Sequence, residues 1–212
     1  MLVICPSRGR PGNIAELLER WEDTGSAARL VVCVDDDDPH LHEYRRLGVR
    51  LVVGKRASLG GWLNRMVGEA EHHRIVGFIG DDVRPRTDRW DARIGEAMPE
   101  FGVVYGDDGH QHERMPTHPF IDARIIRRLG FIAPPGVEHL YLDDFWRAVG
   151  NHLGTLTYLA DVELEHMHPH AGKAEMDDGY REVNSAAAYR HGRAAFERYM
   201  SSGFAADMAA LA

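Results

Sequence analysis

Cysteine is scarce in this chain of 212 residues, which has only Cys5 and Cys33. Each lies inside an apolar, strand-like run, so we interpret both as reduced thiols of the core, which argues against a disulfide scaffold or a cysteine-based zinc cluster. The sequence also lacks an apolar run near the roughly 18 residues that a membrane-spanning helix needs. Its first five residues are too short for the hydrophobic region of a signal peptide. These absences predict a soluble, cytoplasmic protein with no membrane partner.

Positive charge is in deficit. The formal net charge is −8, with 33 Asp and Glu against 25 Lys and Arg. Broad attraction to a nucleic-acid backbone is therefore not expected, although a modified base is not excluded as a partner. The local basic groups Arg8, Arg10, Lys55 and Arg56 still suit the binding of a phosphate.

Hydrophobic and charged residues, at 44% and 27%, are in ordinary proportion for a globular protein. Apolar strand-like runs alternate with segments of helical spacing, and this alternation predicts a parallel sheet. The expected strands are 2–5, 30–34, 49–53 and 75–79, and the expected helices are 13–21, 62–70 and 90–98. The sequence therefore predicts a single α/β domain over 1–200, with a mainly parallel sheet flanked by helices.

The alternation weakens after residue 101. We expect a strand at 103–105, a polar, His-rich loop at 106–119, helices at 123–129, 143–149 and 189–200, and a strand at 156–159. We assign nucleotide binding to residues 1–100, approximately, and the acceptor and catalytic groups to about 101–185. The Ala-rich tail, 201–212, is open to interpretation as a helix, a dimer contact or a frayed end.

Acidic residues follow two of the expected strands. Asp35 and Asp36 follow the second, and Asp81 and Asp82 follow the fourth. The carboxyl ends of parallel strands form the ligand-binding edge of an open α/β sheet. Adjacent carboxylates repel one another unless a cation joins them, and oxygen ligands suit Mg²⁺ or Mn²⁺. The alternative is a solvated turn or helix cap, which we favour for Asp37 and Asp38.

Four motifs in order carry a family resemblance. They are Pro6-Ser7-Arg8-Gly9-Arg10-Pro11, Val34-Asp35-Asp36, Ser58-Leu59-Gly60-Gly61-Trp62-Leu63-Asn64 and Phe78-Ile79-Gly80-Asp81-Asp82-Val83. With them the chain, over about 1–170, resembles the glycosyltransferases of the GT-A fold and is similar to family 2. The resemblance implies metal-dependent transfer of a sugar from a nucleotide-sugar to an acceptor hydroxyl.

The resemblance also implies a donor site. Base and ribose map to Pro6, Ser7, Arg8 and either Asp35 or Asp36, because a carboxylate accepts hydrogen bonds from hydroxyls. The family's Asp-X-Asp lacks its first acid here, which leaves the metal ligand open between Asp81 and Asp82. UDP is the nucleotide we favour. The remaining residues expected to bind the donor are Arg10, Arg56, Gly60, Asn64, Asp81 and Lys173. Lys173 would reach the diphosphate once the loop 171–179 closes. A solvated surface lysine is an equally good interpretation of Lys173.

The stretch Tyr141-Leu142-Asp143-Asp144-Phe145-Trp146-Arg147 resembles the acidic pair that begins a helix in these enzymes. There the second acid often acts as general base, which places that role on Asp144, with Asp143 second. Attack would then invert the anomeric configuration. The alternative role for both acids is capping of the helix.

A His-rich segment, Glu165-His166-Met167-His168-Pro169-His170, follows the last expected strand. Alternate residues of an extended segment project to the same side. Because GT-A enzymes often take a late histidine as metal ligand, the resemblance indicates His166 or His168. The alternative is that these are solvated histidines in a chain that has 13.

Other functions fit parts of the pattern. A nucleotidyltransferase uses a similar sheet and metal, but commonly has a longer Gly-rich first loop. A receiver-like signalling domain also holds Mg²⁺ after a strand, but is nearer 120 residues long. A nucleotide-sugar-binding module without turnover is compatible with the incomplete Asp-X-Asp.

Overall fold

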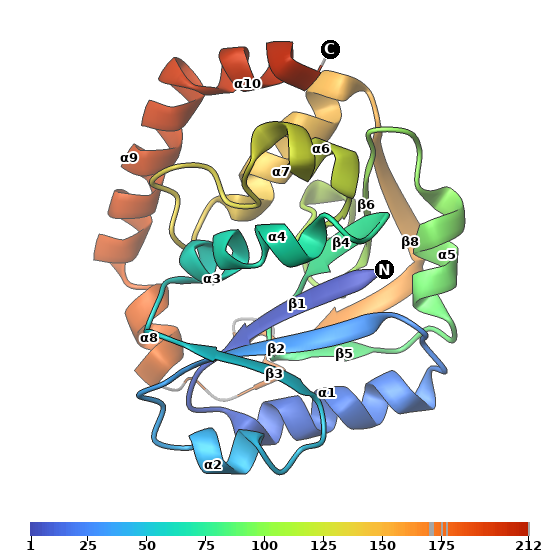
Figure 1. The fold of residues 1–212 in the computed structure, drawn as a ribbon, viewed down its shortest axis with the longest axis vertical. Helices are drawn as coiled ribbons and strands as arrows, with labels where there is room; N and C mark the ends of the chain where they lie inside the picture. The colour runs from blue at the N-terminus through green and yellow to red at the C-terminus, as the bar shows by residue number, and fades with distance from the viewer. Residues whose placement is uncertain (170–171, 175, 177, 212) are drawn as a thin grey trace.

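The computed structural model describes residues 1–169, 172–174, 176 and 178–211. Eight strands of this described part form one sheet in the order β3-β2-β1-β4-β7-β6-β8-β5 (Figure 1). The strands are β1 (Leu2–Ser7), β2 (Arg29–Asp35), β3 (Arg50–Gly54), β4 (Ile75–Phe78), β5 (Val83–Pro85), β6 (Val103–Asp107), β7 (Phe120–Asp122) and β8 (Leu156–His166).

The sheet is mixed. Four neighbouring pairs are parallel, namely β1 with β2, β1 with β4, β2 with β3 and β6 with β8. Three are antiparallel, namely β4 with β7, β6 with β7 and β5 with β8. The α/β prediction is confirmed, and the antiparallel pairs come from β5 and β7, which have three residues each. Strands of three residues are too short to show an alternating pattern in the sequence.

Helices cover both faces of the sheet (Figure 1). They are α1 (Pro11–Asp23), α2 (Leu41–Tyr44), α3 (Leu59–Arg65), α4 (Val67–Ala70), α5 (Trp90–Ala97), α6 (Ala123–Leu129), α7 (Leu142–Leu153), α8 (Asp178–Val183), α9 (Ala186–Ser202) and α10 (Phe204–Leu211), with a 3₁₀ turn η1 at His112–Arg114. The predicted 62–70 helix is two helices, because the backbone leaves helical geometry at Met66.

Two hydrophobic cores hold the layers together. On one face, α1 and α5 bury Ile14, Leu17 and Trp90 against the sheet. On the other face, α3, α4, α6 and α7 pack together with α9 and α10. Large buried residues of this second core are Trp62, Leu63, Phe145, Trp146 and Tyr199. Trp62, Trp90 and Trp146, all in helices, are therefore core residues.

Both cysteines are buried and free. Burial raises the pKa of Cys5 and raises that of Cys33 to about 12, so both are protonated thiols, as the sequence predicts. The tail contributes α10, which buries Met208 and Leu211 beside α6 and α9. In the described part of the chain, no helix is long and apolar enough to cross a membrane.

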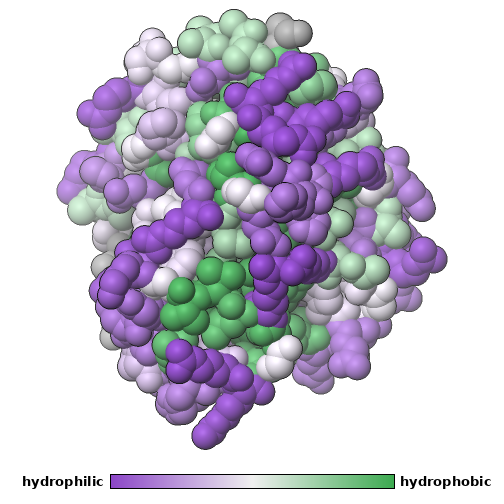
Figure 2. Space-filling view, viewed as in Figure 1, coloured by the Kyte–Doolittle hydropathy of each residue, from purple (hydrophilic) through white to green (hydrophobic). Residues whose placement is uncertain are grey.

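The edge strand β3 carries an apolar surface. In the same orientation as Figure 1, Figure 2 shows apolar side chains gathered below the centre of the view, over the region of β3. Val53 of this strand is 38% exposed. Arg50, the first residue of the strand, forms an ion pair with Glu69 of α4. Charged side chains on an edge strand disfavour pairing with a strand of another molecule.

Strand β8 changes register halfway along. Gly106 of β6 pairs with Leu159, but the next residue, Asp107, pairs with Glu163, so residues 160–162 bulge out. Beyond the bulge, β8 pairs with β5 and places His166 opposite Val83. The predicted strand at 156–159 is only the first half of β8.

We predict that Gly106→Ala destabilises the fold. A Cβ at this position lies 2.3 Å from the carbonyl oxygen of Val162, which is backbone in the bulge and has little freedom to move. The expected loss, measured by urea unfolding, is about 1–3 kcal/mol. The control is Gly68→Ala in α4, where a Cβ meets nothing within 4 Å and stability should hold or rise. Equal midpoints for both variants would contradict the close contact.

Candidate functional site

The carboxyl ends of β1, β2 and β4 bring Ser7, Asp35 and Asp81 to one edge of the sheet. Asp81 is buried, and its carboxylate accepts hydrogen bonds from Ser7 Oγ at 2.6 Å, Asn13 Nδ2 at 3.3 Å and Arg10 Nη1 at 3.4 Å. Burial and the charge of Asp82 raise the pKa of Asp81, while these three donors oppose the rise. Asp81 therefore faces the first loop and helix α1.

Tyr44 of α2 fixes the first loop. Its hydroxyl lies 2.8 Å from Ser7 Oγ and accepts the backbone N–H of Arg10 at 2.8 Å. Since Ser7 gives its proton to Asp81, Tyr44 donates to Ser7, and the chain of hydrogen bonds runs in one direction. Burial raises the pKa of Tyr44 to about 12, so the phenol keeps its proton. Gly9 in the same loop donates its N–H to Asp38 at 2.7 Å.

Asp35 and Asp36 differ although they are neighbours. Asp35 is buried at the end of β2 and accepts from Trp62 Nε1 at 2.8 Å, Ala57 N at 3.2 Å and Arg8 Nη1 at 2.9 Å. Asp36 is exposed and pairs with Lys55 at 2.8 Å. Of the two acids predicted to bind ribose, Asp35 is therefore occupied by protein donors and Asp36 faces solvent.

Several other predicted donor-binding residues contact the protein itself. The N–H of Gly60 donates to Glu138 O at 2.7 Å, and a Cβ there would lie 2.5 Å from Val137 O. Asn64 binds the backbone of Ile132 and Ala133 through both ends of its amide. These contacts hold the 131–141 loop against α3.

The remaining residues predicted to bind the donor are less enclosed. Pro6 pairs with Cys33 inside the sheet. Arg56 is exposed, and its charge helps to lower the pKa of Asp37, behind the hydrogen bond from Arg8. Asp37 is exposed in the turn after β2, as predicted, whereas Asp38 is buried there.

Asp82 contacts His166. The pairing of β5 with β8 places Asp82 Oδ2 3.3 Å from His166 Nε2, and Met167 donates its N–H to Asp82 O at 2.8 Å. Burial favours a neutral Asp82, but the hydrogen bond and charge of His166 outweigh burial and lower its pKa to about 2. The carboxylate in turn raises the pKa of His166 against the effect of burial. Two residues 84 positions apart thus form one ion pair at this edge.

His168 lies beside His166 but has other partners. The two rings are 4.9 Å apart, edge to face, and His168 Nε2 is hydrogen-bonded to the hydroxyl of Tyr180. His168 also stacks on His110 at 5.2 Å. The third histidine of the motif, His170, and parts of the 171–179 loop lie outside the described residues.

Lys173 lies next to this cluster in an ion pair with Glu165 at 2.8 Å. Arg86 binds the same carboxylate at 2.6 Å. Hydrogen bonds from Lys173 and Arg86 lower the pKa of Glu165, with that from Lys173 the larger contribution. Lys173 is thus tied to β8 and is not a freely solvated side chain.

The predicted metal ligands do not all converge. In the described ranges, no group of three or more His, Cys, Asp or Glu is arranged to hold a metal ion. Asp82 and His166 nevertheless offer an oxygen and a nitrogen side by side, a donor set that Mn²⁺ accepts, whereas Asp81 and His168 are engaged elsewhere. These two donors fit a divalent cation that takes its other ligands from substrate and water.

Asp143 and Asp144 begin α7, as predicted. Asp143 Oδ1 accepts the backbone N–H of Asp144 at 3.0 Å, and Asp144 Oδ1 accepts from Arg147 Nη2 at 2.9 Å. Burial, together with the charge of Asp144, raises the pKa of Asp143 to about 6. Arg147 also donates to Arg114 O at 2.9 Å, which ties α7 to the 106–119 loop.

Two buried residues of that loop escape sequence reasoning. Asp108 accepts the N–H groups of three successive residues, 110 to 112, and the hydroxyl of Thr117. His118 is 5% exposed, and neither ring nitrogen has a hydrogen-bond partner. Burial lowers its pKa to about 3. The sequence hint that His118 is buried is its position just before Pro119 and the apolar residues Phe120 and Ile121. The strand that these residues form, β7, has only three residues and is too short to be predicted from the sequence.

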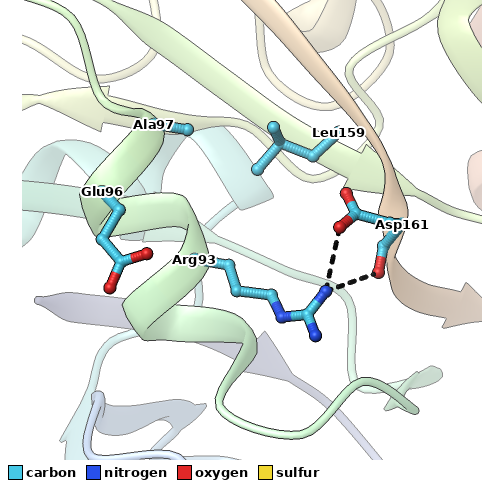
Figure 3. A pocket seen from close by; sticks show the side chains of 5 residues that line it. All are labelled: Arg93, Glu96, Ala97, Leu159 and Asp161. Carbon is cyan, nitrogen blue, oxygen red and sulfur yellow. Dashed lines mark hydrogen bonds and ion pairs between the residues drawn. The ribbon is translucent and has the colours of Figure 1, made fainter.

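An open hollow between α5 and β8 holds none of the predicted site residues (Figure 3). Arg93 and Asp161 form an ion pair across it, with Nη1 and Oδ2 2.9 Å apart. Glu96, Ala97 and Leu159 complete its lining. The candidate site is therefore the edge that carries Asp81 and Asp82, and not this hollow.

No protein-family model and no curated protein matches the sequence. Solved structures do match the fold. A cytidylyltransferase from Leptospira borgpetersenii has a TM-score of 0.55 at 11% identity, covering 94% of this chain and 92% of that chain. A Desulfovibrio desulfuricans G20 protein assigned as a nucleotide-diphospho-sugar transferase has a TM-score of 0.53 at 11% identity, covering 93% and 97%.

A manganese complex from Mycobacterium tuberculosis H37Rv is similar to this chain to the same degree. Its TM-score is 0.53 at 14% identity, covering 87% of this chain and 97% of that chain. At these identities the likeness is one of fold alone. The chain thus has the fold of nucleotide-diphospho-sugar transferases, the class to which GT-A-like proteins belong.

We predict that Asp35→Ala destabilises the protein, because it leaves the buried Trp62 Nε1 and Ala57 N without an acceptor. The expected loss in free energy of unfolding is about 2–4 kcal/mol. Asp36→Ala, the matched control, removes an exposed carboxylate and should change stability by less than about 0.5 kcal/mol. A chemical denaturation series measures both. Similar losses would show that Asp35 is not the structural member of the pair.

Proposed function

We propose that the chain is a divalent-metal-dependent glycosyltransferase that moves a sugar from a nucleotide-sugar to an acceptor hydroxyl with inversion. The observation that supports this most is the contact of Asp82 with His166 beside the network of Ser7, Arg10 and Asp81. A carboxylate and an imidazole meet at the edge where open α/β sheets bind ligands. The fold of the solved structures agrees with this class of reaction.

The first loop and the end of β2 would bind the nucleotide. Arg8 and Arg10 are partly exposed and carry the positive charge of this region, and Asp36 presents a carboxylate to solvent for ribose hydroxyls. Asp35 and Asp81 hold the first loop in place through hydrogen bonds from Arg8 and Arg10. Lys173 would bind the diphosphate after leaving Glu165. The preference for UDP rests on the family resemblance alone.

Asp82 and His166 would hold Mn²⁺ or Mg²⁺. When bound, the ion neutralises the charge that develops on the diphosphate as the sugar–phosphate bond breaks. Asp82 suits this role better than Asp81, because three protein donors already surround the Asp81 carboxylate. Arg10 of the first loop reaches Asp81 at 3.4 Å, and its charge would also face the diphosphate.

A carboxylate at the start of α7 would take the proton of the acceptor hydroxyl. The resemblance places this base on Asp144, with Asp143 second, but their surroundings favour the reverse order. Asp144 is paired with Arg147 at 2.9 Å, whereas burial raises the pKa of Asp143 to about 6. A base is more effective when its pKa lies near the working pH.

The length of the first loop favours glycosyl transfer over nucleotidyl transfer. Only Arg8, Gly9 and Arg10 separate β1 from α1. A nucleotidyltransferase commonly needs a longer Gly-rich loop at this place. The two reactions differ in their products, since glycosyl transfer from a nucleotide-sugar releases nucleoside diphosphate, whereas nucleotidyl transfer joins a nucleoside triphosphate to a sugar phosphate and releases pyrophosphate.

We expect nucleoside diphosphates and their sugars to bind with Mn²⁺ and to lose affinity with EDTA. Calorimetry with UDP, GDP and their sugars measures this, and Asp82→Ala should weaken the metal-dependent binding at least about tenfold. Asp161→Ala, in the hollow of Figure 3, is the matched control and should bind as the wild type does.

The same preparations distinguish the alternatives. Release of nucleoside diphosphate from a bound nucleotide-sugar supports glycosyl transfer, and pyrophosphate formed from a nucleoside triphosphate and a sugar phosphate supports nucleotidyl transfer. Binding without any turnover supports a binding module. If none of these ligands binds, the donor site proposed here is wrong.

We predict that turnover, followed as nucleoside diphosphate release, falls as the pH drops through about 6, since the base must be ionised and the pKa of Asp143 is raised to about 6. Asp143→Asn should lower kcat about 10²- to 10⁴-fold and abolish this acid limb. Asp144→Asn removes a charge that raises the pKa of Asp143, so the limb should move to lower pH. Loss of turnover in Asp144→Asn, with Asp143→Asn active, would return the base to Asp144.

A further inference from the structure

His118 is a buried polar side chain without a partner. It is 5% exposed, and both Nδ1 and Nε2 lack a hydrogen bond. It lies at the end of the His-rich loop, immediately before Pro119, whose carbonyl joins β4 through Phe78 N. A neutral imidazole has one N–H donor and one acceptor nitrogen. Leaving such a group buried and unsatisfied destabilises the folded state, so a partner is expected.

His166 also has a buried ring nitrogen without a hydrogen-bond partner. Its Nε2 faces Asp82, but its Nδ1 is also buried without a partner. The rings of His118 and His166 lie 5.1 Å apart, edge to face. Three unpartnered ring nitrogens thus belong to two histidines in contact. A buried water that joins polar groups of this kind is an ordinary part of protein interiors.

The neighbouring acids do not meet this need. Asp82 is paired with Nε2 of His166. The Asp108 carboxylate accepts hydrogen bonds from the N–H groups of residues 110 to 112 and from the hydroxyl of Thr117. The charges of these two carboxylates act on His118, and neither accepts a hydrogen bond from Nδ1 of His166 in this structure. The imidazole of His118 lies in contact with His166 and has unpartnered nitrogens, which makes it the candidate acceptor.

We propose that His118 is a positioning residue for His166, whose Nδ1–H it accepts through one shared buried water. This hydrogen bond fixes the ring of His166 with Nε2 toward Asp82. A histidine that binds a metal through one nitrogen almost always donates its other N–H to such a partner, which orients the ring. The inference rests on the metal site of the proposed function, but the pairing of the two rings is present in the metal-free protein.

The first test is the affinity of the full chain for Mn²⁺ alone, measured from the free-ion signal in electron paramagnetic resonance. His118→Phe keeps an apolar ring but removes the acceptor, and it should weaken Mn²⁺ binding about 10- to 100-fold. His118→Gln retains an acceptor and should restore part of the affinity. His42→Phe, at an exposed position, is the matched control and should bind as the wild type does.

The second test needs no metal. In ¹⁵N-labelled wild-type protein, the Nδ1 proton of His166 should give a slowly exchanging, downfield signal, and His118→Phe should shift it upfield. His118→Leu, which also removes the acceptor, serves the same purpose if the Phe variant does not fold. A signal and a Mn²⁺ affinity that both stay unchanged when His118 is replaced would overturn the proposal. Failure of the wild type to bind Mn²⁺ counts against the metal site, whereas the proton signal still decides the pairing.

Discussion

Buried carboxylates at the ends of parallel strands determine how this end of the molecule is built. Asp35 and Asp81 are both withdrawn from water, and an ionised carboxylate in that position needs several donors around it. The donors come from segments far apart in the chain. The end of β1 and the first loop supply Ser7 and Arg8, and the segment after β3, which includes the start of α3, supplies Ala57 and Trp62. The loops that line the candidate site are thus held in place by charges that do not themselves face solvent.

The half of the fold that the sequence predicts well is the half with strong periodicity. Strands β1 and β2 are apolar runs rich in Val, Ile and Leu that end at Ser7 and Asp35, and helix α1 has apolar residues at helical spacing. The ending of each strand also places the acids correctly, since parallel strands end at one edge. The sequence likewise identifies Asp82 and His166 as candidates, and the structure brings them into contact. That both bind a metal stays a prediction, as does the division of the chain near residue 100.

The sequence does not reveal which neighbour each polar side chain takes. Gly60 and Asn64 lie in a stretch that resembles a family motif, but in this structure their hydrogen bonds go to the 131–141 loop, which packs against α3. The burial of His118 could not be predicted from the sequence for a different reason. Its burial depends on β7, and a strand of three residues that is antiparallel to both neighbours leaves no periodic signal. Long-range pairing, and not local preference, creates both features.

The bulge in β8 divides one strand into two parts that belong to different surroundings. Before residues 160–162 the strand pairs with β6; after them Glu163 still pairs with Asp107 of β6, and residues 164–166 pair with β5. Side chains alternate along a strand, so in a regular strand the insertion or deletion of one residue would turn every later side chain to the opposite face. The bulge lets the two parts of β8 keep separate registers. The face on which His166 lies is therefore set by its pairing with a three-residue edge strand, and not by the longer pairing of the first part with β6.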